Sequence, residues 1–197
     1  SHLMQARNGV YAAATGPSGA QQFTKTSNMP TSKNCDLAFV RLKDVAPEDI
    51  AAHMSHPRLR DHMPLLKGRW DLARVSDFIA AKEENWSRDG LGHWAILHDG
   101  QYIGWGGFQK EGDDWDYGLV LKPDCFGLGL RVTAKALDFA RADVRIPHVT
   151  CLLPPSRKNL GALARIGAQC VGETSYGGAS FLKYRLETSG IEPDRHP

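Results

Sequence analysis

Two glycines separated by one residue stand just before a helical pattern in the middle of the chain. Gly127-Leu128-Gly129 follows a short apolar run at residues 119–121, and from Leu130 onward apolar residues recur at helical spacing. The spacing predicts a helix that begins at Leu128 and leaves its first backbone N–H groups unpaired. These groups, the positive end of the helix dipole and Arg131 favour a bound phosphate, and a glycine lets an anion come close to the backbone. The residues expected to contact a phosphate are Gly127, Leu128, Gly129, Leu130 and Arg131.

Two other phosphate-binding motifs fit these residues poorly. The P-loop requires a lysine followed by serine or threonine at the start of the helix, where this chain has Leu130-Arg131. The dinucleotide-binding motif requires a further glycine, where this chain has Val132. It also requires a βαβ unit that carries a ribose-binding acid about 20 residues later, and this chain does not show that combination.

Alternating apolar residues, helical spacing and turn residues predict the elements around this site. Strands are expected over 37–42, 92–98, 101–108, 117–122, 149–153, 168–178 and 180–187, and helices from Pro47, over 71–88, from Leu128 and over 156–166. Asp99-Gly100 predicts a tight hairpin, and Gly167 is expected to close the last helix. Because a helix joins the strands at 117–122 and 149–153, these two strands are expected to be parallel.

The stretch from Asp116 to Gly129 resembles the acetyl-CoA motif of the GNAT N-acetyltransferases. It is most similar to the branch that includes the ribosomal-protein N-terminal acetyltransferases, whose motif positions are held here by Asp116, Tyr117, Gly118, Leu119, Leu121, Pro123, Phe126, Gly127 and Gly129. Asp124 departs from the family, which has Gln or Arg there, and is expected to point away from a pyrophosphate. The resemblance covers residues 37–187. It implies an α/β (α+β) GNAT fold, in which a V-shaped gap between two parallel strands divides a mostly antiparallel sheet with helices on both faces.

The resemblance also implies acetyl-CoA as the cofactor. Its pantetheine arm would pair with the backbone of Leu119, Val120 and Leu121, which the gap exposes, and its pyrophosphate would lie at residues 127–131 beside Phe126. Ser156 takes the position of the family's asparagine, and Asn159 lies three residues further on. Both are expected to contact the pantetheine chain, although Ser156 is also a good helix N-cap.

Transfer of an acetyl group to an amine requires a base, a donor for the developing oxyanion and an acid for the leaving thiolate. Asp116 takes the position where relatives often carry a general-base glutamate; the alternative is a surface acid at a strand end. A backbone N–H of residues 119–121 would stabilise the oxyanion. Leu163 replaces the family's general-acid tyrosine, so Ser156 or a water molecule would have to protonate the thiolate.

A groove for the acceptor amine is expected beside the first two helices. His62 and Trp70 are expected to line it, and Trp94 or Trp105 could form its floor, although core packing is the competing interpretation for both. His53, His56, Asp61 and His62 do not form an HExxH motif and have no cysteine partner, so no metal is expected.

The predicted function is therefore direct acetyl transfer from acetyl-CoA to a primary amine in a ternary complex. The acceptor could be a small molecule or a protein N-terminus. One alternative is a protein that binds CoA or acyl-CoA without turnover. Another is transfer of an acyl chain longer than acetyl, which open space beyond the thioester would permit.

The length of 197 residues and the apolar content of 42% are consistent with one domain. We expect that domain over 35–189, an expression scar and flexible tail over 1–34, and a short tail over 190–197. A net charge of +2 does not indicate a nucleic-acid surface, and no apolar run is long enough to span a membrane. Four scattered cysteines without a CxxC pair are consistent with a reduced, cytoplasmic protein. We expect either a monomer or a homodimer.

Overall fold

The computed structural model describes residues 36–63, 68–155 and 160–189. The tails predicted at 1–34 and 190–197 lie outside the described residues, and so do Cys35, Ser156 and Asn159. The side chains of Asp61, His62 and Ala162 also lie outside the described part.

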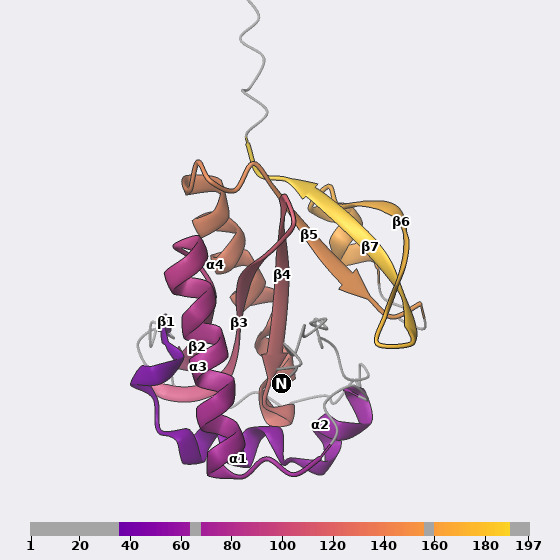
Figure 1. Ribbon diagram of the computed structural model, residues 1–197. Coiled ribbons are helices and arrows are strands. Elements are labelled where there is room, and N and C mark those ends of the chain that lie inside the picture. The colour runs from indigo at the N-terminus through magenta and orange to yellow at the C-terminus, as the bar shows by residue number, and fades with distance from the viewer. Residues whose placement is uncertain (1–35, 64–67, 156–159, 190–197) are drawn as a thin grey trace, which may run out of the picture.

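The described residues form one seven-stranded sheet with the strand order β1-β2-β3-β4-β5-β7-β6 (Figure 1). Neighbouring strands are antiparallel except for β4 and β5, which are parallel, so the predicted mixed sheet is confirmed. The strands are β1 (Leu37–Arg41), β2 (His93–His98), β3 (Gln101–Glu111), β4 (Asp114–Leu121), β5 (His148–Leu153), β6 (Gln169–Tyr176) and β7 (Ala179–Glu187).

Helices cover both faces of the sheet, as predicted. Residues of α1, α2 and α3 pack with one cluster of buried side chains, and residues of α4 pack with a second cluster on the opposite face. The helices are α1 (Pro47–Met54), α2 (Pro57–His62), α3 (Leu72–Asp89), α4 (Gly129–Ala142) and α5 (Gly161–Arg165), with short 3₁₀ turns η1 (Leu42–Asp44) and η2 (Pro123–Leu128).

Several local sequence signals have the predicted structural effect. Pro47 is the first residue of α1, where its missing N–H costs no hydrogen bond. Asp99 and Gly100 both have positive φ, at 50° and 78°, as a tight turn between β2 and β3 requires. Gly167 has a φ of 83° and ends α5. These features depend only on neighbouring residues, which explains why the sequence predicts them.

Several elements differ from the prediction. In the described part of the helix predicted over 156–166, α5 begins at Gly161 and Leu160 is not helical. Residues 57–62 form α2, because Pro57 suits a first helical turn and the His56 Nδ1 accepts a hydrogen bond from the Arg58 N–H at 3.2 Å. Strand β4 begins at Asp114 rather than at Tyr117. The turn before it is a tight one in which Gly112 has a φ of 62°. As a result Asp116 lies within a central strand and is buried, so the alternative of a surface acid at a strand end is wrong.

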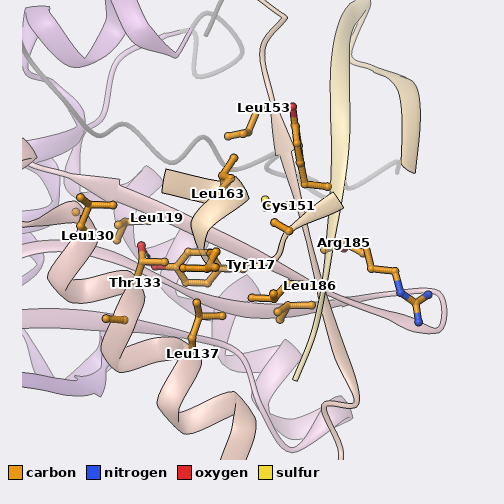
Figure 2. Close-up of a pocket in the computed structure, with 17 residues that line it drawn as sticks. Tyr117, Leu119, Leu130, Thr133, Leu137, Cys151, Leu153, Leu163, Arg185 and Leu186 are labelled. Carbon is orange, nitrogen blue, oxygen red and sulfur yellow. Dashed lines mark hydrogen bonds between the residues drawn. The ribbon is translucent and has the colours of Figure 1, made fainter. Parts of the chain in front are cut away.

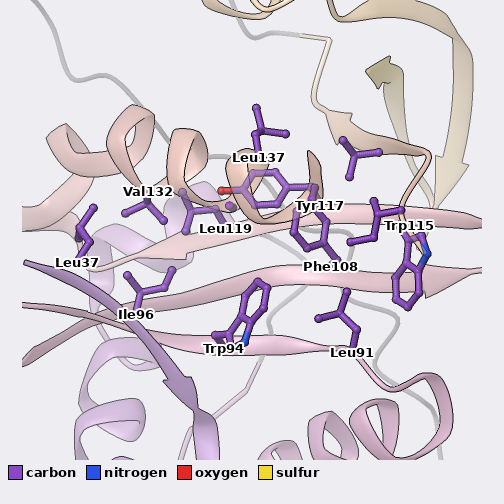
Figure 3. Close-up of a cluster of buried hydrophobic side chains, with 14 of the residues drawn as sticks. Leu37, Leu91, Trp94, Ile96, Phe108, Trp115, Tyr117, Leu119, Val132 and Leu137 are labelled. Carbon is purple, nitrogen blue, oxygen red and sulfur yellow. The ribbon is translucent and has the colours of Figure 1, made fainter. Parts of the chain in front are cut away.

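Trp94 and Trp105, which the sequence allows as the floor of an acceptor groove, both belong to the core. Trp94 lies on the α4 face and packs against Phe39, Trp86, Phe108 and Phe139 (Figure 3). Trp105 lies on the other face, is 0% exposed and donates its indole N–H to the Met54 Sδ at 3.3 Å. The structure therefore gives both indoles a packing role, and we do not include them in the proposed site.

Strand β3 approaches β4 closely because it contains glycines. A Cβ atom at Gly106 would lie 2.3 Å from the Gly118 carbonyl oxygen and 2.9 Å from the Leu119 Cα, and neither backbone atom can move independently of its strand. Gly106→Ala should therefore push β4 away from β3 and lower the free energy of unfolding by roughly 3 kcal/mol. Urea unfolding measures the loss. Gly161→Ala is the matched control, because a Cβ there meets nothing within 4 Å; equal midpoints for the two variants would contradict the prediction.

Candidate active site

The parallel strands β4 and β5 are paired over only two positions, Trp115 with Val149 and Asp116 with Thr150. Beyond these pairs the strands diverge, as Figure 1 shows. Strand β5 instead stays paired with β7 over all six residues from His148 to Leu153, so it follows β7 away from β4. We call this separation the split. It confirms the predicted V-shaped gap and leaves the β5-facing backbone of residues 117–121 without a partner strand among the described residues.

A pocket adjoins the split on the α4 face of the sheet. It has an empty volume of about 930 Å³, part of which is open to solvent. Its walls are mainly apolar and come from α4, α5 and the strands on both sides of the split (Figure 2). The lining residues are Tyr117, Leu119, Gly129, Leu130, Thr133, Ala134, Leu137, Val149, Thr150, Cys151, Leu153, Leu163, Ile166, Ala168, Tyr184, Arg185 and Leu186.

The turn predicted to bind phosphate lies at one end of this pocket. Helix α4 begins at Gly129, one residue later than predicted, because η2 precedes it. The Gly129 N–H donates to the Phe126 carbonyl oxygen, so the expectation that all the amides at this turn are unpaired is wrong for Gly129. Leu128 supplies no side-chain cap, and a Cβ at Gly127 would meet nothing within 4 Å. Space therefore remains beside the backbone at Gly127.

Two charged residues near this turn are exposed. Asp124, which departs from the family motif, has a side chain that is 90% exposed, with its carboxylate 3.6 Å from the Arg58 guanidinium. Arg131 is exposed on the first turn of α4.

Asp116 lies where the split begins. Asp116 is 9% exposed, and its carboxyl group accepts a hydrogen bond from the Thr150 Oγ1 at 3.1 Å. Burial raises the pKa of Asp116 to about 7, and the nearby carboxylates of Glu111 and Asp114 also favour the protonated form, whereas the Thr150 hydrogen bond and Lys183 oppose the rise. A carboxyl group with a pKa near neutrality is well suited to accept a proton from an amine.

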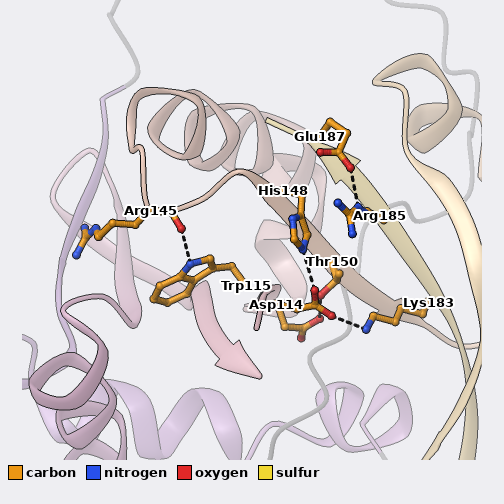
Figure 4. Close-up of polar contacts among 9 residues, drawn as sticks. Asp114, Trp115, Arg145, His148, Thr150, Lys183, Arg185 and Glu187 are labelled. Atoms are coloured by element: carbon orange, nitrogen blue, oxygen red, sulfur yellow. Dashed lines mark hydrogen bonds and ion pairs between the residues drawn. The ribbon is translucent and has the colours of Figure 1, made fainter. Parts of the chain in front are cut away.

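Asp114, two residues earlier on the same strand face, has the opposite electrostatic environment. Its carboxylate oxygens lie 2.8 Å from the His148 Nε2 and 2.7 Å from the Lys183 Nζ (Figure 4). The hydrogen bond from Lys183, followed by that from His148, lowers the pKa of Asp114. Asp114 is therefore held as an ion, while Asp116 can exchange a proton near neutral pH. Two acids with separated pKa values in one site are typical of acid–base chemistry.

The pocket and the Asp116 carboxyl group lie on opposite faces of β4. Side chains alternate along a strand, and Tyr117 and Leu119 line the pocket on the α4 face. Asp116 consequently points to the face covered by α1 to α3. The split is the place where a ligand in the pocket and a molecule on the other face could meet.

The remaining predicted acceptor residues are placed as follows. Trp70 is buried against Phe78 at a ring-centroid distance of 5.4 Å, with the Arg74 guanidinium 4.3 Å from its ring. His62 is the last residue of α2, and its side chain lies outside the described part. Among the described residues, Cys125, Cys151 and Cys170 form no disulfide bond.

Four polar residues of the site were assigned no role from the sequence, although Tyr117 is a position of the motif. Thr150 holds Asp116, and Tyr117 donates to or accepts from the Thr133 Oγ1 at 3.0 Å within the pocket wall. Tyr184 adds a second phenol to the lining. Thr150 is 34 positions from Asp116 in sequence, so only the register of β4 against β5 could have revealed the contact.

Two further findings bear on the class of protein. Among residues 36–63, 68–155 and 160–189, no three histidine, cysteine or acidic side chains lie close enough together to hold a metal ion. None of the helices in these ranges is both long and apolar enough to cross a membrane.

The split sheet, the glycine turn before α4 and the adjoining pocket define the fold of an acyltransferase. Residues 37–167 match the family model described as an acetyltransferase (GNAT) domain, and the chain belongs to this family. No curated protein matches the chain in sequence.

Solved structures share the fold at low sequence identity. An acetyltransferase from Agrobacterium tumefaciens is 20% identical, with a TM-score of 0.59, over 85% of this chain and 99% of its own. The Campylobacter jejuni N-acetyltransferase PseH, solved with acetyl coenzyme A, is 15% identical, with a TM-score of 0.58, over 78% of this chain and 99% of its own. Mycobacterium smegmatis RimJ, solved with CoA-disulfide, is 18% identical, with a TM-score of 0.56, over 73% of this chain and 79% of its own.

Proposed function

We propose that this protein transfers an acetyl group from acetyl-CoA to a primary amine, with Asp116 as the general base. The observation that carries the proposal is the position of Asp116. Its carboxyl group has a pKa of about 7 and lies at the start of the split between β4 and β5. Solved relatives of the same fold contain acetyl coenzyme A or CoA-disulfide, which supports the choice of donor.

The residues of the pocket fit such a donor. The unpartnered backbone of residues 117–121 can pair with the amides of an extended chain, as an added strand would. The apolar walls suit the methylene and methyl groups of the same chain. The turn at Gly127 and the start of α4 can receive the pyrophosphate, with Arg131 as the nearby cation. When it is bound, acetyl-CoA supplies a thioester whose acyl group can be transferred.

The chain's own residues then have separate tasks. Asp116 accepts the proton of the incoming ammonium group, and Thr150 keeps the Asp116 carboxyl group oriented by its hydrogen bond of 3.1 Å. A backbone N–H of β4 on the unpaired side stabilises negative charge on the acyl oxygen. The leaving thiolate receives a proton from water, from Ser156 or from Tyr184, whose side chain lines the pocket.

The acceptor enters from the face opposite the pocket in this proposal. Asp116 points to that face, where Glu111 and Asp114 add negative charge, and Lys183 adds one positive charge, close enough to affect its pKa. A cationic amine is therefore favoured over an anionic acceptor. A protein N-terminus and a small-molecule amine both remain within the proposal, and membership of the ribosomal-protein branch stays a prediction.

The test is an acetyl-CoA consumption assay with the full chain across polyamines, amino acids, aminoglycosides and N-terminal peptides. Release of CoA with at least one amine, together with an acetylated product identified by mass spectrometry, supports the enzyme. The second candidate is a protein that binds acyl-CoA without turnover, and the replacement of the family tyrosine by Leu163 favours it. Tight binding of acetyl-CoA without consumption of any amine would support that candidate instead.

Gly127→Ala should weaken the binding of CoA about tenfold, which corresponds to the loss of about one charge-assisted hydrogen bond. The added methyl group points into the open space beside the turn, where the pyrophosphate is proposed. Because this methyl group meets no protein atom within 4 Å, the melting temperature should not fall. Calorimetric titration with CoA measures the affinity. Asp138→Ala, an exposed change further along α4, is the control. Unchanged affinity of Gly127→Ala would place the pyrophosphate elsewhere.

A further inference from the structure

The pocket continues past the point where the split ends. Val149 and Leu186 line the pocket, yet they belong to the closed part of the sheet, where Val149 is paired with Trp115 on one side and with Leu186 on the other. Leu137, two turns along α4 from Leu130, covers the same region. We call the part lined by Leu137, Val149 and Leu186 the inner section. A chain that pairs with the open edge of β4 ends before it, because that edge stops at Asp116.

The inner section follows directly from the donor site. Figure 2 shows Tyr117 and Thr133 between Leu119 and Leu130 at one end and Leu137 and Leu186 at the other. Strand β4 and helix α4 run in opposite directions along the pocket, since Leu121 and Leu130 lie near the glycine turn and Tyr117 and Leu137 lie far from it. A ligand that extends from the turn along the pocket toward the closed end of the split therefore points into the inner section.

The inner section offers apolar contacts and few polar ones. Its three defining side chains are aliphatic, and all three are at least 90% buried. The neighbouring Tyr117 hydroxyl is already bonded to the Thr133 Oγ1 at 3.0 Å. The Arg185 guanidinium is bonded to Glu187 at 2.6 Å and, in Figure 2, lies away from the other labelled residues. A charged or strongly polar guest would lose its hydration there without replacement, whereas a hydrocarbon chain would not.

We propose that the donor site accepts straight-chain acyl-CoA thioesters longer than acetyl, with the acyl chain in the inner section. This inference rests on the proposed function, because it needs the thioester at the end of the split. An apolar side chain of the acceptor is the other possible occupant, but Asp116 directs the acceptor to the opposite face of β4.

The transfer itself is the same for each chain length. The amine nitrogen forms a bond to the acyl carbon, and the carbon–sulfur bond breaks. Asp116 takes the proton released by the amine, and CoA leaves as the thiol after protonation. No oxidant, reductant or metal is required.

The first experiment measures the affinity of the wild-type full chain for CoA, acetyl-CoA, butanoyl-CoA, hexanoyl-CoA and octanoyl-CoA by calorimetry without an acceptor. Each buried methylene should tighten binding by up to about fourfold until the inner section is full. Hexanoyl-CoA should therefore bind at least about tenfold more tightly than acetyl-CoA. Affinity that stays constant or falls beyond acetyl would overturn the inference. Failure of every thioester and of CoA itself to bind would instead overturn the proposed function.

The second experiment locates the chain. Leu137→Phe fills part of the inner section and should reduce the advantage of hexanoyl-CoA over acetyl-CoA to about twofold or less. Leu91→Phe is the matched control, because Leu91 is a similarly buried leucine of the same core cluster that does not line the pocket. It should keep the advantage. An undiminished advantage in Leu137→Phe would overturn the placement of the chain, and if this variant does not fold, the wild-type series decides the question alone.

Discussion

Asp116→Asn should lower kcat for acetyl transfer by a factor of about 10² to 10⁴, the range typical of losing a general base. Asparagine has nearly the same shape and can still accept the hydrogen bond from Thr150, so the site should keep its geometry. The affinity for acetyl-CoA should stay unchanged, because the proposed donor contacts are the backbone edge of residues 117–121 and side chains on the other face of β4. Stopped assays with the best amine of the acceptor panel measure kcat, and calorimetry measures the affinity.

The pH dependence gives an independent readout of the same residue. A base must be deprotonated to act, and Asp116 has a pKa of about 7. In the wild type, kcat/KM should therefore rise about tenfold per pH unit below pH 7 and level off above it. This inflection should disappear in Asp116→Asn.

Asp114→Asn is the matched control for both measurements. It replaces a carboxyl group on the same strand face with an amide. Asp114, however, is bonded to His148 and Lys183 and does not lie at the split. We expect the variant to retain an inflection, shifted below that of the wild type because the Asp114 charge contributes to the raised pKa of Asp116. Retention of more than a tenth of wild-type kcat by Asp116→Asn would show that another group removes the proton.

The same substitution should increase stability at alkaline pH. Folding raises the pKa of Asp116 from 3.8 to about 7, so the folded state binds a proton that the unfolded state has already released in this window. Stability contributed by this group is therefore present below pH 4 and is lost as the pH rises toward 7. Each tenfold change in proton affinity is worth about 1.4 kcal/mol, so the ionised Asp116 costs about 4 kcal/mol at pH 8. Asp116→Asn should recover a similar amount.

Urea unfolding of the two proteins at pH 4.5 and pH 8 measures this effect. The stability difference in favour of Asp116→Asn should be large at pH 8 and small at pH 4.5. Lys82, whose pKa burial lowers to about 7, changes stability in the opposite direction above pH 7. Lys82 is present in both proteins, so its contribution cancels in the comparison. A variant that is less stable than the wild type at both pH values would contradict the prediction.

Much of the fold could be predicted because its signals are local. The Asp99-Gly100 turn, Pro47 at the start of α1 and Gly167 after α5 each act through the immediate backbone. The glycine turn before α4 likewise led to the family, which the match over residues 37–167 shows. The parallel pairing of β4 with β5 followed from the helix that joins them.

The details of the site depended on contacts that sequence spacing does not reveal. The polar and aromatic residues at 114–117 alternate, which is a strand pattern. The prediction nevertheless starts this strand at Tyr117 instead of Asp114, so it leaves open an exposed position for Asp116. Asp116 in fact lies inside the sheet, paired with Gln109 of β3 on one side and with Thr150 of β5 on the other. The bond from Lys183 to Asp114 spans 69 positions, so it exists only through the order of β4, β5 and β7. The inner section likewise depends on how far β4 and β5 stay paired.

The short closed end of the split has a mechanical consequence. Among the described residues, only two register pairs link the β1–β4 half of the sheet to the β5–β7 half. Asp114 reinforces this join by binding one side chain from β5 and one from β7. The two halves are therefore connected by a short strand pairing, whereas the strands within each half are paired over longer stretches. A ligand bound between β4 and β5 would therefore add contacts between the two halves of the sheet, at positions where the described residues form no strand pairs.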